Sequence, residues 1–201
     1  MLKTPKTVIF DIGNVLMEFK WAPFAKKHFG DRAGTVSATI WAGGWWNELD
    51  RGVLTPDEVI KCAKLSAPEY ADDIEFAFEN VGECAKRRDY SIPWIKELKA
   101  LGAQVLYLSN YSHFYINKRP DVLDFLPFMD GGVFSCDVHL VKPDPAIYRC
   151  IAEKYNLVPS DCLFIDDKRV NCALSRTVGF NAHDFVDYEA AYSATKEFLS
   201  L

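Results

Sequence analysis

Three short apolar segments, each followed by a polar residue, constrain the fold of this chain most strongly. They are Val8–Phe10 before Asp11, Val105–Leu108 before Ser109, and Cys162–Ile165 before Asp166. A short continuous apolar run is typical of a strand buried on both faces of a sheet. In parallel sheets ligands bind beyond the carboxyl ends of the strands. We therefore expect the three polar ends to meet at one crevice.

Helix signals alternate with the later strands. Asp144, an N-cap residue, is followed by Pro145 and predicts a helix that runs to about Tyr155. A second helix is expected to begin near Arg169 and to end at Gly179. Strands that alternate with helices are typical of a parallel sheet, so the sequence predicts an α/β fold with a Rossmann-like parallel sheet core.

The interval between the first two predicted strands, Ile12 to Ala103, contains an insertion. It is far longer than a crossover helix of about a dozen residues requires. Thr55-Pro56-Asp57-Glu58 forms a capping box with proline at the first helical position. Further helices are expected over Pro23–Phe29 and Glu69–Asn80. Ser91 is expected to cap a third, which runs to Ala100 and is ended by Gly102. We predict an α/β core over residues 1–19 and 90–201, with a small all-helical cap over residues 20–89.

The charge balance argues against a nucleic-acid partner. Of 201 residues, 23 are Lys or Arg and 28 are Asp or Glu, which gives a net charge of −5 and no basic tract. The longest segment without charged residues, Ala100–Asn117, is interrupted by polar residues and is unsuited to cross a membrane. Val8–Phe10 is too short for a secretory signal. We expect a cytoplasmic protein without a membrane partner, and the sequence indicates no particular oligomeric state.

The cysteines and histidines show no metal-ligand spacing. The six cysteines, which we expect to be reduced and buried, are Cys62, Cys84, Cys136, Cys150, Cys162 and Cys172. The histidines are His28, His113, His139 and His183. Only His113, which closely follows Ser109-Asn110, is a candidate for the site, and packing at a helix start is the alternative for it.

Carboxylates follow two of the three predicted strands. Asp11 is followed by Gly13, which allows a tight turn and leaves its backbone amide and carbonyl open to a ligand. Asp166 and Asp167 leave another strand at the same predicted edge. Carboxylates that face one crevice repel each other unless a cation lies between them, and an all-oxygen site suits Mg2+. The alternative is that Asp166 caps the following helix and Asp167 is solvated.

Other polar groups near this edge are suited to binding phosphate oxygens. Ser109 and Asn110 supply a hydroxyl and an amide at the end of the middle strand, although both residue types also begin turns. Lys142 precedes Pro143 and lies close to Pro145, where the prolines fix the backbone and a helix start favours anions. A rigidly held lysine neutralises charge that develops on a phosphoryl group. The alternative is an exposed loop lysine.

Four segments together are typical of one enzyme superfamily. They are Val8–Leu16, Leu106–Asn110, Lys142–Tyr148 and Phe164–Asn171, the last followed by Gly179. With these motifs in this order, the chain resembles the haloacid dehalogenase (HAD) superfamily over essentially its whole length. The resemblance implies a HAD-like core with the helical insertion in the cap position. The Asp-x-Gly-Asn-Val start is shared with a branch that resembles the alpha-glucose-1-phosphatases.

The resemblance implies a Mg2+-dependent phosphatase that acts on a small phosphorylated metabolite, with a sugar phosphate among the candidates. Asp11 is then the nucleophile, which forms an aspartyl-phosphate. Mg2+ is held by Asp11, the backbone carbonyl of Gly13 and Asp167, and Asp166 supports it through water or as a ligand. The residues implied to bind phosphoryl oxygens are Ser109, Asn110 and Lys142, and Asn171 is implied to orient the acidic pair.

Gly13 departs from the pattern of many phosphatases of the superfamily, which carry a second Asp at this position as the general acid. General acid assistance contributes about 10²- to 10⁴-fold to the rate. Without a residue that replaces this acid, we expect a lower rate of hydrolysis. Glu18, His113 and a metal-bound water are the candidate substitutes. Two other functions stay open. One is a metal-independent dehalogenase, against which the Asp166-Asp167 pair argues, and the other is a catalytically weak phosphometabolite-binding or regulatory protein.

Three tryptophans form the most distinctive part of the predicted cap. Trp41, Trp45 and Trp46 precede Glu48 and the segment Asp50-Arg51-Gly52. Aromatic clusters usually pack in a core, and we expect the same here. The alternative is that one ring lines the crevice while Glu48 or Asp50 binds substrate hydroxyls.

Overall fold

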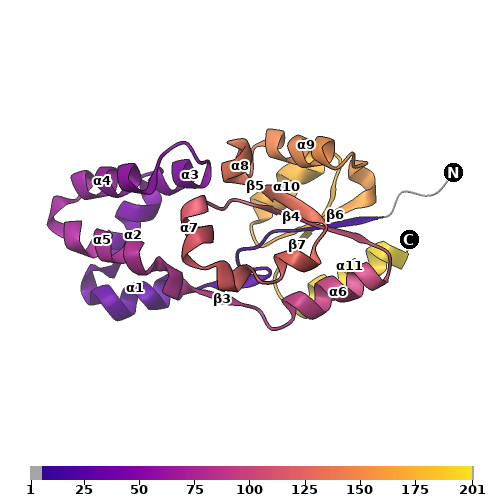
Figure 1. Cartoon of the computed structure of the whole chain (residues 1–201), viewed down its shortest axis with the longest axis horizontal. Coiled ribbons are helices and arrows are strands. Elements are labelled where there is room, and N and C mark those ends of the chain that lie inside the picture. Colours follow the sequence, from indigo (N-terminus) through magenta and orange to yellow (C-terminus); the bar gives the residue numbers. More distant parts are fainter. Residues whose placement is uncertain (1–5, 201) are drawn as a thin grey trace.

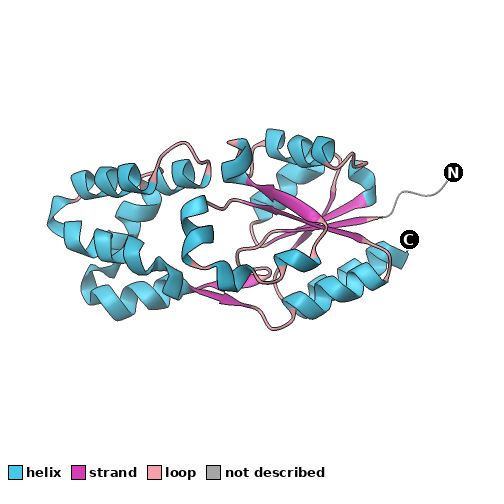
Figure 2. Ribbon diagram, in the orientation of Figure 1, coloured by secondary structure: helices cyan, strands magenta, loops and turns pink. Residues whose placement is uncertain are grey.

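A parallel sheet of five strands lies at the centre of the α/β part of the molecule (Figure 2). The computed structural model describes residues 6–200. The strands are β1 (Thr7–Phe10), β4 (Gln104–Ser109), β5 (Gly131–Phe134), β6 (Cys162–Asp166) and β7 (Asn181–Asp184), in the order β5-β4-β1-β6-β7. Each neighbouring pair is parallel. The predicted α/β fold with a Rossmann-like parallel sheet is confirmed.

Helices cover both faces of this sheet and form a separate group after β1. After the sheet's first strand come α1 (Trp21–Phe29), α2 (Ala33–Ala42), α3 (Trp45–Asp50), α4 (Pro56–Ser66) and α5 (Ala71–Asn80). The later helices are α6 (Ser91–Ala100), α7 (His113–Lys118), α8 (Ser135–Val138), α9 (Pro145–Lys154), α10 (Arg169–Thr177) and α11 (Tyr188–Ser200). Within residues 6–200, none of these helices combines the length and apolar character needed to cross a membrane.

The alternation of side chains along β1 explains why the sheet has a core on each face. Val8 and Phe10 belong to one cluster, where the Phe10 ring meets Trp94 of α6 edge to face at a centroid distance of 4.7 Å. Ile9 points the other way and belongs to a second cluster with Tyr148 of α9. The sheet is therefore buried on both sides, as a continuous apolar strand requires.

The helical insertion, which we define as α1–α5, lies at one end of the molecule (Figure 1, indigo to purple). The capping box that begins α4 is present, because Thr55 accepts from the Glu58 amide and Glu58 accepts from the Thr55 amide. The chain enters and leaves through β2 (Met17–Phe19) and β3 (Ala85–Arg87), which pair antiparallel. The prediction that residues 20–89 are all helical is therefore wrong at β3. There the chain forms a strand, because β2 and β3 satisfy each other's backbone hydrogen-bonding groups. The division into core and cap domains stays a prediction.

Three predicted helix starts differ from the structure by one or two residues. Helix α5 begins at Ala71 and not at Glu69, because Pro68–Tyr70 form a turn of 3-10 helix before it. Ser91 is the first residue of α6 and not its cap, because its Oγ donates to the carbonyl oxygen of Leu16 at 2.6 Å. Helix α1 begins at Trp21, before Pro23, since proline is tolerated in the first helical turn. The helices predicted from Asp144 and near Arg169 are α9 and α10.

All six cysteines are free thiols. Four are buried, and Cys62 and Cys150 are only partly buried. Burial raises the pKa of Cys84, Cys162 and Cys172 to about 12. These three thiols therefore stay protonated at neutral pH and act as small apolar side chains.

Candidate active site

The carboxyl ends of β1, β4 and β6 are adjacent in the sheet and bring the predicted polar residues together. Asp11, Ser109 and Asp166 leave these three strands and are 7%, 1% and 0% exposed. The Ser109 hydroxyl donates a hydrogen bond to Asp11 Oδ1 at 2.8 Å. The predicted crevice at this edge of the sheet is therefore present.

Lys142 is buried between two carboxylates. Its ammonium nitrogen lies 2.9 Å from Asp11 Oδ1 and 2.6 Å from Asp166 Oδ2. Burial alone lowers the pKa of Lys142, but the two carboxylates outweigh burial and raise this pKa above its usual value. The alternative of an exposed loop lysine is wrong, and Lys142 is a fixed positive charge in the site.

Asn110 holds the Lys142 backbone in place. Its amide oxygen accepts from the Lys142 N–H at 2.8 Å, and its amide nitrogen donates to the Lys142 carbonyl at 2.9 Å. One of the two amide hydrogens remains for a ligand. Asn110 therefore positions the lysine, a contact that the sequence did not indicate.

One carboxylate oxygen of Asp11 receives every hydrogen bond and ion pair that this side chain makes within residues 6–200. Oδ1 accepts from the Ser109 hydroxyl, from the Ile12 N–H at 2.8 Å and from Lys142. Burial and the charge of Asp166 raise the pKa of Asp11 to about 6, against the opposing effect of Lys142. Oδ1 is thus fixed by three donors, and Oδ2 is left for a ligand.

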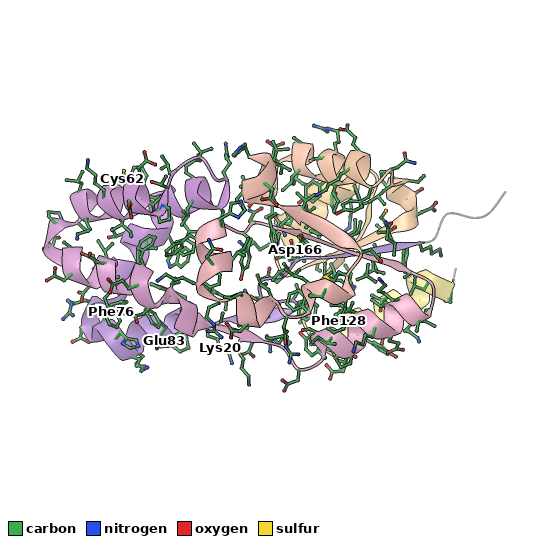
Figure 3. All side chains as sticks on the ribbon, in the orientation of Figure 1. Lys20, Cys62, Phe76, Glu83, Phe128 and Asp166 are labelled. Atoms are coloured by element: carbon green, nitrogen blue, oxygen red, sulfur yellow. The ribbon has the colours of Figure 1, made fainter. Side chains whose placement is uncertain are left out.

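Asp166 lies deep in the α/β part of the molecule (Figure 3), and both of its oxygens are occupied. Oδ1 accepts from the Lys168 N–H at 2.8 Å and from the Asn171 amide at 2.9 Å. Oδ2 accepts from Lys142 and, at 3.0 Å, from the same Asn171 amide. Asn171 therefore contacts and orients Asp166, as predicted for one member of the acidic pair.

Asp167 is partly exposed and completes a group of acidic oxygens. Oxygen atoms of Asp11, Asp166 and Asp167 all lie within 4.8 Å of one another. Gly13 lines the same cavity and offers a backbone carbonyl. This set consists only of oxygen donors, three of them carboxylates, and such a set fits Mg2+.

Asn14 is a site residue that the sequence reasoning missed. It adopts a left-handed backbone conformation (φ 58°). Its amide nitrogen donates to Asp167 Oδ2 at 3.0 Å, and its amide oxygen accepts from the Phe19 N–H at 3.1 Å. Asparagine tolerates this conformation when its side chain is bonded locally, so Asn14 orients Asp167 and anchors β2.

A cavity of about 230 Å³ opens over these residues. The sheet contributes Asp11, Ser109 and Asp167, and Lys142 lines it as well. The helical insertion contributes four residues from α2 and α3, which are Trp41, Trp46, Asn47 and Asp50. The cavity is therefore bounded by both parts of the chain.

The tryptophan cluster both packs and lines this cavity. The Trp41 and Trp46 rings lie 4.5 Å apart, and Trp46 also packs on Phe78 at 5.6 Å. Trp45 and Glu48 are not among the residues that line the cavity. Trp41 and Trp46 therefore line the crevice, as the alternative interpretation of the cluster predicted.

Neither side chain predicted to replace the missing acid reaches the cavity. Glu18 lies 2.7 Å from Lys20 and 2.5 Å from Arg88, and the hydrogen bond from Lys20 keeps the pKa of Glu18 below its usual value. The His113 side chain is 64% exposed and lies 3.0 Å from Asp137. Neither Glu18 nor His113 lines the cavity.

His113 instead belongs to a second group of possible metal ligands. Donor atoms of His113, Cys136 and Asp137 lie within 4.8 Å of one another. Spacing in the sequence did not indicate this group, because His113 lies on α7 and the other two residues lie on α8. The remaining histidines, His28, His139 and His183, are likewise absent from the cavity wall.

The end of α3 is held tightly against α8. Gly52, just beyond α3, has φ 71°, and a Cβ added there lies 2.8 Å from the Cys136 carbonyl oxygen. The Ser135 hydroxyl donates to the carbonyl oxygen of Asp50. This α3–α8 contact fixes the part of the insertion that faces the cavity.

We expect Gly52→Ala to lower the free energy of unfolding by about 3 kcal/mol, because it adds both backbone strain and a steric clash. Gly102→Ala is the matched control, since Gly102 has φ 84° but no atom within 4 Å of an added Cβ. This control should cost only about 1 kcal/mol of strain. Urea unfolding of both variants measures the difference, and equal losses contradict a close contact at Gly52.

The model of the haloacid dehalogenase-like hydrolase family matches residues 5–173 of the chain. The chain therefore belongs to this family of hydrolases. The fold and the order of the four motifs agree with this membership. Within the family, the alpha-glucose-1-phosphatase-like branch is not established by the match.

Several curated proteins are similar to this chain. Sesquiterpene phosphatase astK of Aspergillus oryzae is 24% identical over 179 residues, which cover 89% of each chain. Flavin mononucleotide hydrolase 1 of Arabidopsis thaliana is 26% identical over 160 residues, 78% of this chain and 61% of that protein. Acyl-CoA dehydrogenase family member 10 of Mus musculus is 23% identical over 206 residues, and the chain spans only 19% of its length.

A solved structure of a HAD family enzyme from Bacteroides thetaiotaomicron, in complex with magnesium and inorganic phosphate, has a similar fold. The TM-score is 0.75 and the sequence identity is 16%, over 93% of this chain and 98% of that chain. At this identity the likeness concerns the fold.

Proposed function

We propose that this hydrolase is a Mg2+-dependent phosphatase that cleaves a small phosphate ester through an aspartyl-phosphate on Asp11. The observation that carries the proposal is the environment of this carboxylate. Oδ1 is held by Ser109 and Lys142, and within residues 6–200 no donor forms a hydrogen bond or ion pair with Oδ2. A buried, oriented carboxylate with one free oxygen beside a fixed lysine suits nucleophilic attack on phosphorus. The names of the fungal and plant relatives, a phosphatase and a flavin mononucleotide hydrolase, support this reaction class.

The reaction takes two steps at Asp11. In the first, Asp11 Oδ2 forms a bond to phosphorus and the bond from phosphorus to the ester oxygen breaks. In the second, water attacks the phosphorus, the bond to Asp11 breaks, and inorganic phosphate leaves. Lys142 neutralises charge on Asp11 and on the transferred group throughout, and Ser109 keeps the carboxylate oriented.

The residues proposed to hold Mg2+ are Asp11, the Gly13 carbonyl and Asp167, with Asp166 in support. When bound, the ion neutralises negative charge on the phosphoryl group. Asp166 is occupied by Lys142, Asn171 and the Lys168 amide, which favours a supporting role for it. Within residues 6–200, the Asp167 side chain accepts one hydrogen bond, from Asn14, and so has oxygen lone pairs left for a ligand.

Asp167→Asn is expected to weaken Mg2+ binding about 100-fold, and Asp166→Asn about 10-fold, because a ligand is lost in the first variant and only its support in the second. Calorimetric titration with MgCl2 measures both affinities, and urea unfolding checks that each variant is folded. Equal losses show that the direct ligand has been assigned to the wrong residue.

The substrate is proposed to be a small phosphorylated metabolite, with sugar phosphates as one class. The Asp-x-Gly-Asn-Val start supports placement in the alpha-glucose-1-phosphatase-like branch. Two rings, Trp41 and Trp46, and two polar side chains, Asn47 and Asp50, supply the stacking surface and polar contacts that a sugar uses. Residues 20–89 are proposed to act as a cap over the core, and the protein is proposed to act in the cytoplasm.

A panel of phosphate esters, assayed for inorganic phosphate with Mg2+ and with EDTA, tests this function. We expect release that requires Mg2+. Release of halide from a 2-haloacid without metal would instead support a dehalogenase. Binding of phosphate esters without turnover would support a regulatory protein.

A further inference from the structure

Gly13 leaves the site without a carboxylate beside the predicted nucleophile. Building on the proposed phosphatase function, we infer that Asp50, from the helical insertion, is the general acid and base of the reaction. It is the residue that donates a proton to the leaving oxygen and later takes one from water.

The cavity wall leaves one acidic residue for this task. Within residues 6–200, three acidic side chains line the cavity, namely Asp11, Asp50 and Asp167. Asp11 is the proposed nucleophile, and Asp167 belongs to the group of acidic oxygens that fits a cation. Asp50 lies outside that group and reaches the cavity from α3 of the helical insertion, whereas Asp11 and Asp167 follow strands of the sheet.

The position of Asp50 is fixed by the core of the protein. It is the last residue of α3, and its carbonyl oxygen accepts from the Ser135 hydroxyl. Two residues further along the chain, Gly52 closely approaches Cys136. These contacts with α8 fix the backbone that carries the Asp50 carboxyl group, as proton transfer at a defined distance requires.

The surroundings of Asp50 allow both protonation states near neutral pH. Burial and the charge of Asp11 raise the pKa of Asp50 to about 7, while Lys168 and a hydrogen bond from Trp46 act in the opposite direction. Two further titratable groups near Asp50 are Tyr111, on the loop after β4, and Cys136, on α8. Lys142, Asp167 and Tyr115 line the same cavity. Burial raises the pKa of the Cys136 thiol to about 11 and that of Tyr111 above its usual value, so both stay neutral.

Asp50 alone accounts for the proton transferred in each of the two steps. In the first step the Asp50 carboxylic acid gives its proton to the ester oxygen as the bond from phosphorus to that oxygen breaks, and the alcohol leaves. In the second, the Asp50 carboxylate takes a proton from the water that attacks the aspartyl-phosphate. The carboxylate of Asp11 and the acid form of Asp50 are both restored.

Asp50→Asn tests this role through the dependence of rate on the leaving group. For alkyl phosphates, kcat/KM should fall by about 10²- to 10⁴-fold, because a basic alkoxide leaves poorly without a proton. For 4-nitrophenyl phosphate it should change by less than about 10-fold, because this leaving group needs little proton assistance. A plot of log(kcat/KM) against leaving-group pKa should steepen in the variant, and Glu48→Gln, on the same helix but outside the cavity, should match the wild type.

Rescue at Gly13 separates proton donation from a structural effect. A Cβ added to Gly13 meets no atom within 4 Å, and this residue has no left-handed backbone conformation, so Gly13→Asp should fold. In the Asp50→Asn background, Gly13→Asp should restore turnover of alkyl phosphates. In the wild type, kcat/KM for an alkyl phosphate should also decline above about pH 7, where Asp50 loses its proton, and this decline should vanish in Asp50→Asn.

Equal losses for alkyl and aryl esters in Asp50→Asn, or no loss for either, overturn the role of Asp50 and leave the phosphatase function standing. Failure of Gly13→Asp to restore alkyl turnover overturns the role as well. If the wild type releases no phosphate from any ester, the phosphatase function fails and the role of Asp50 fails with it.

Discussion

Asp11→Asn is expected to lower kcat for phosphate release by about 10⁴-fold or more, as when an activated nucleophile is removed. The amide keeps the shape of the carboxylate but has no anionic oxygen to attack phosphorus. Steady-state release of inorganic phosphate measures the loss. Retention of more than a tenth of the wild-type rate contradicts a covalent mechanism at this residue.

The same variant should remain folded. An amide oxygen at position 11 still accepts from Ser109, from the Ile12 N–H and from Lys142, which all contact Oδ1. The substitution also removes a carboxylate whose burial already raises its pKa to about 6. We therefore expect the free energy of unfolding to change by less than about 1 kcal/mol, because one buried charge is lost while Asp166 still pairs with the lysine.

Lys142→Met is expected to lower the free energy of unfolding by about 3–5 kcal/mol, because it leaves two buried carboxylates without a counter-charge. Asp11 and Asp166 both lose their contact with the ammonium group. Activity should fall by about 10³-fold, since charge on the transferred phosphoryl group is no longer neutralised. Urea unfolding and phosphate release measure the two effects separately.

Lys20→Met is the control for this substitution. Lys20 lies at the molecular edge (Figure 3), with a side chain that is 63% exposed and 2.7 Å from Glu18. An exposed ion pair contributes about 0–1 kcal/mol, so the control should unfold almost like the wild type. If Lys142→Met lowers the free energy of unfolding no more than Lys20→Met does, the buried lysine does not compensate the charge of the two carboxylates.

The predictable part of the site depends on local sequence and sheet geometry. Asp11, Ser109 and Asp166 each follow or end an apolar strand, and neighbouring parallel strands end at the same edge of the sheet. The apolar runs with polar ends therefore predicted that these three side chains lie close together. Helix starts with a proline and a capping side chain, such as those at Thr55 and Asp144, were also predictable. These signals need no knowledge of distant contacts.

The remaining features depend on contacts between distant segments. Helix α3 has only six residues, too few for an amphipathic pattern, and Asp50 faces the cavity because α3 packs on α8. The roles of Asn14 and Asn110 come from hydrogen bonds to Asp167 and Lys142, which lie far along the chain. Strand β7, with the sequence Asn-Ala-His-Asp, lacks the apolar run that reveals β1, so its pairing with β6 was not predicted.

A covalent intermediate on Asp11 is the central claim, and trapping it is the most direct measurement. The wild type is quenched in acid during turnover of an aryl ester that carries radiolabelled phosphorus, and the digested peptides are mapped. We predict label on the peptide that contains Asp11, and no label when the experiment is repeated with Asp11→Asn. Label on another residue, or phosphate release by Asp11→Asn at the wild-type rate, would contradict the account.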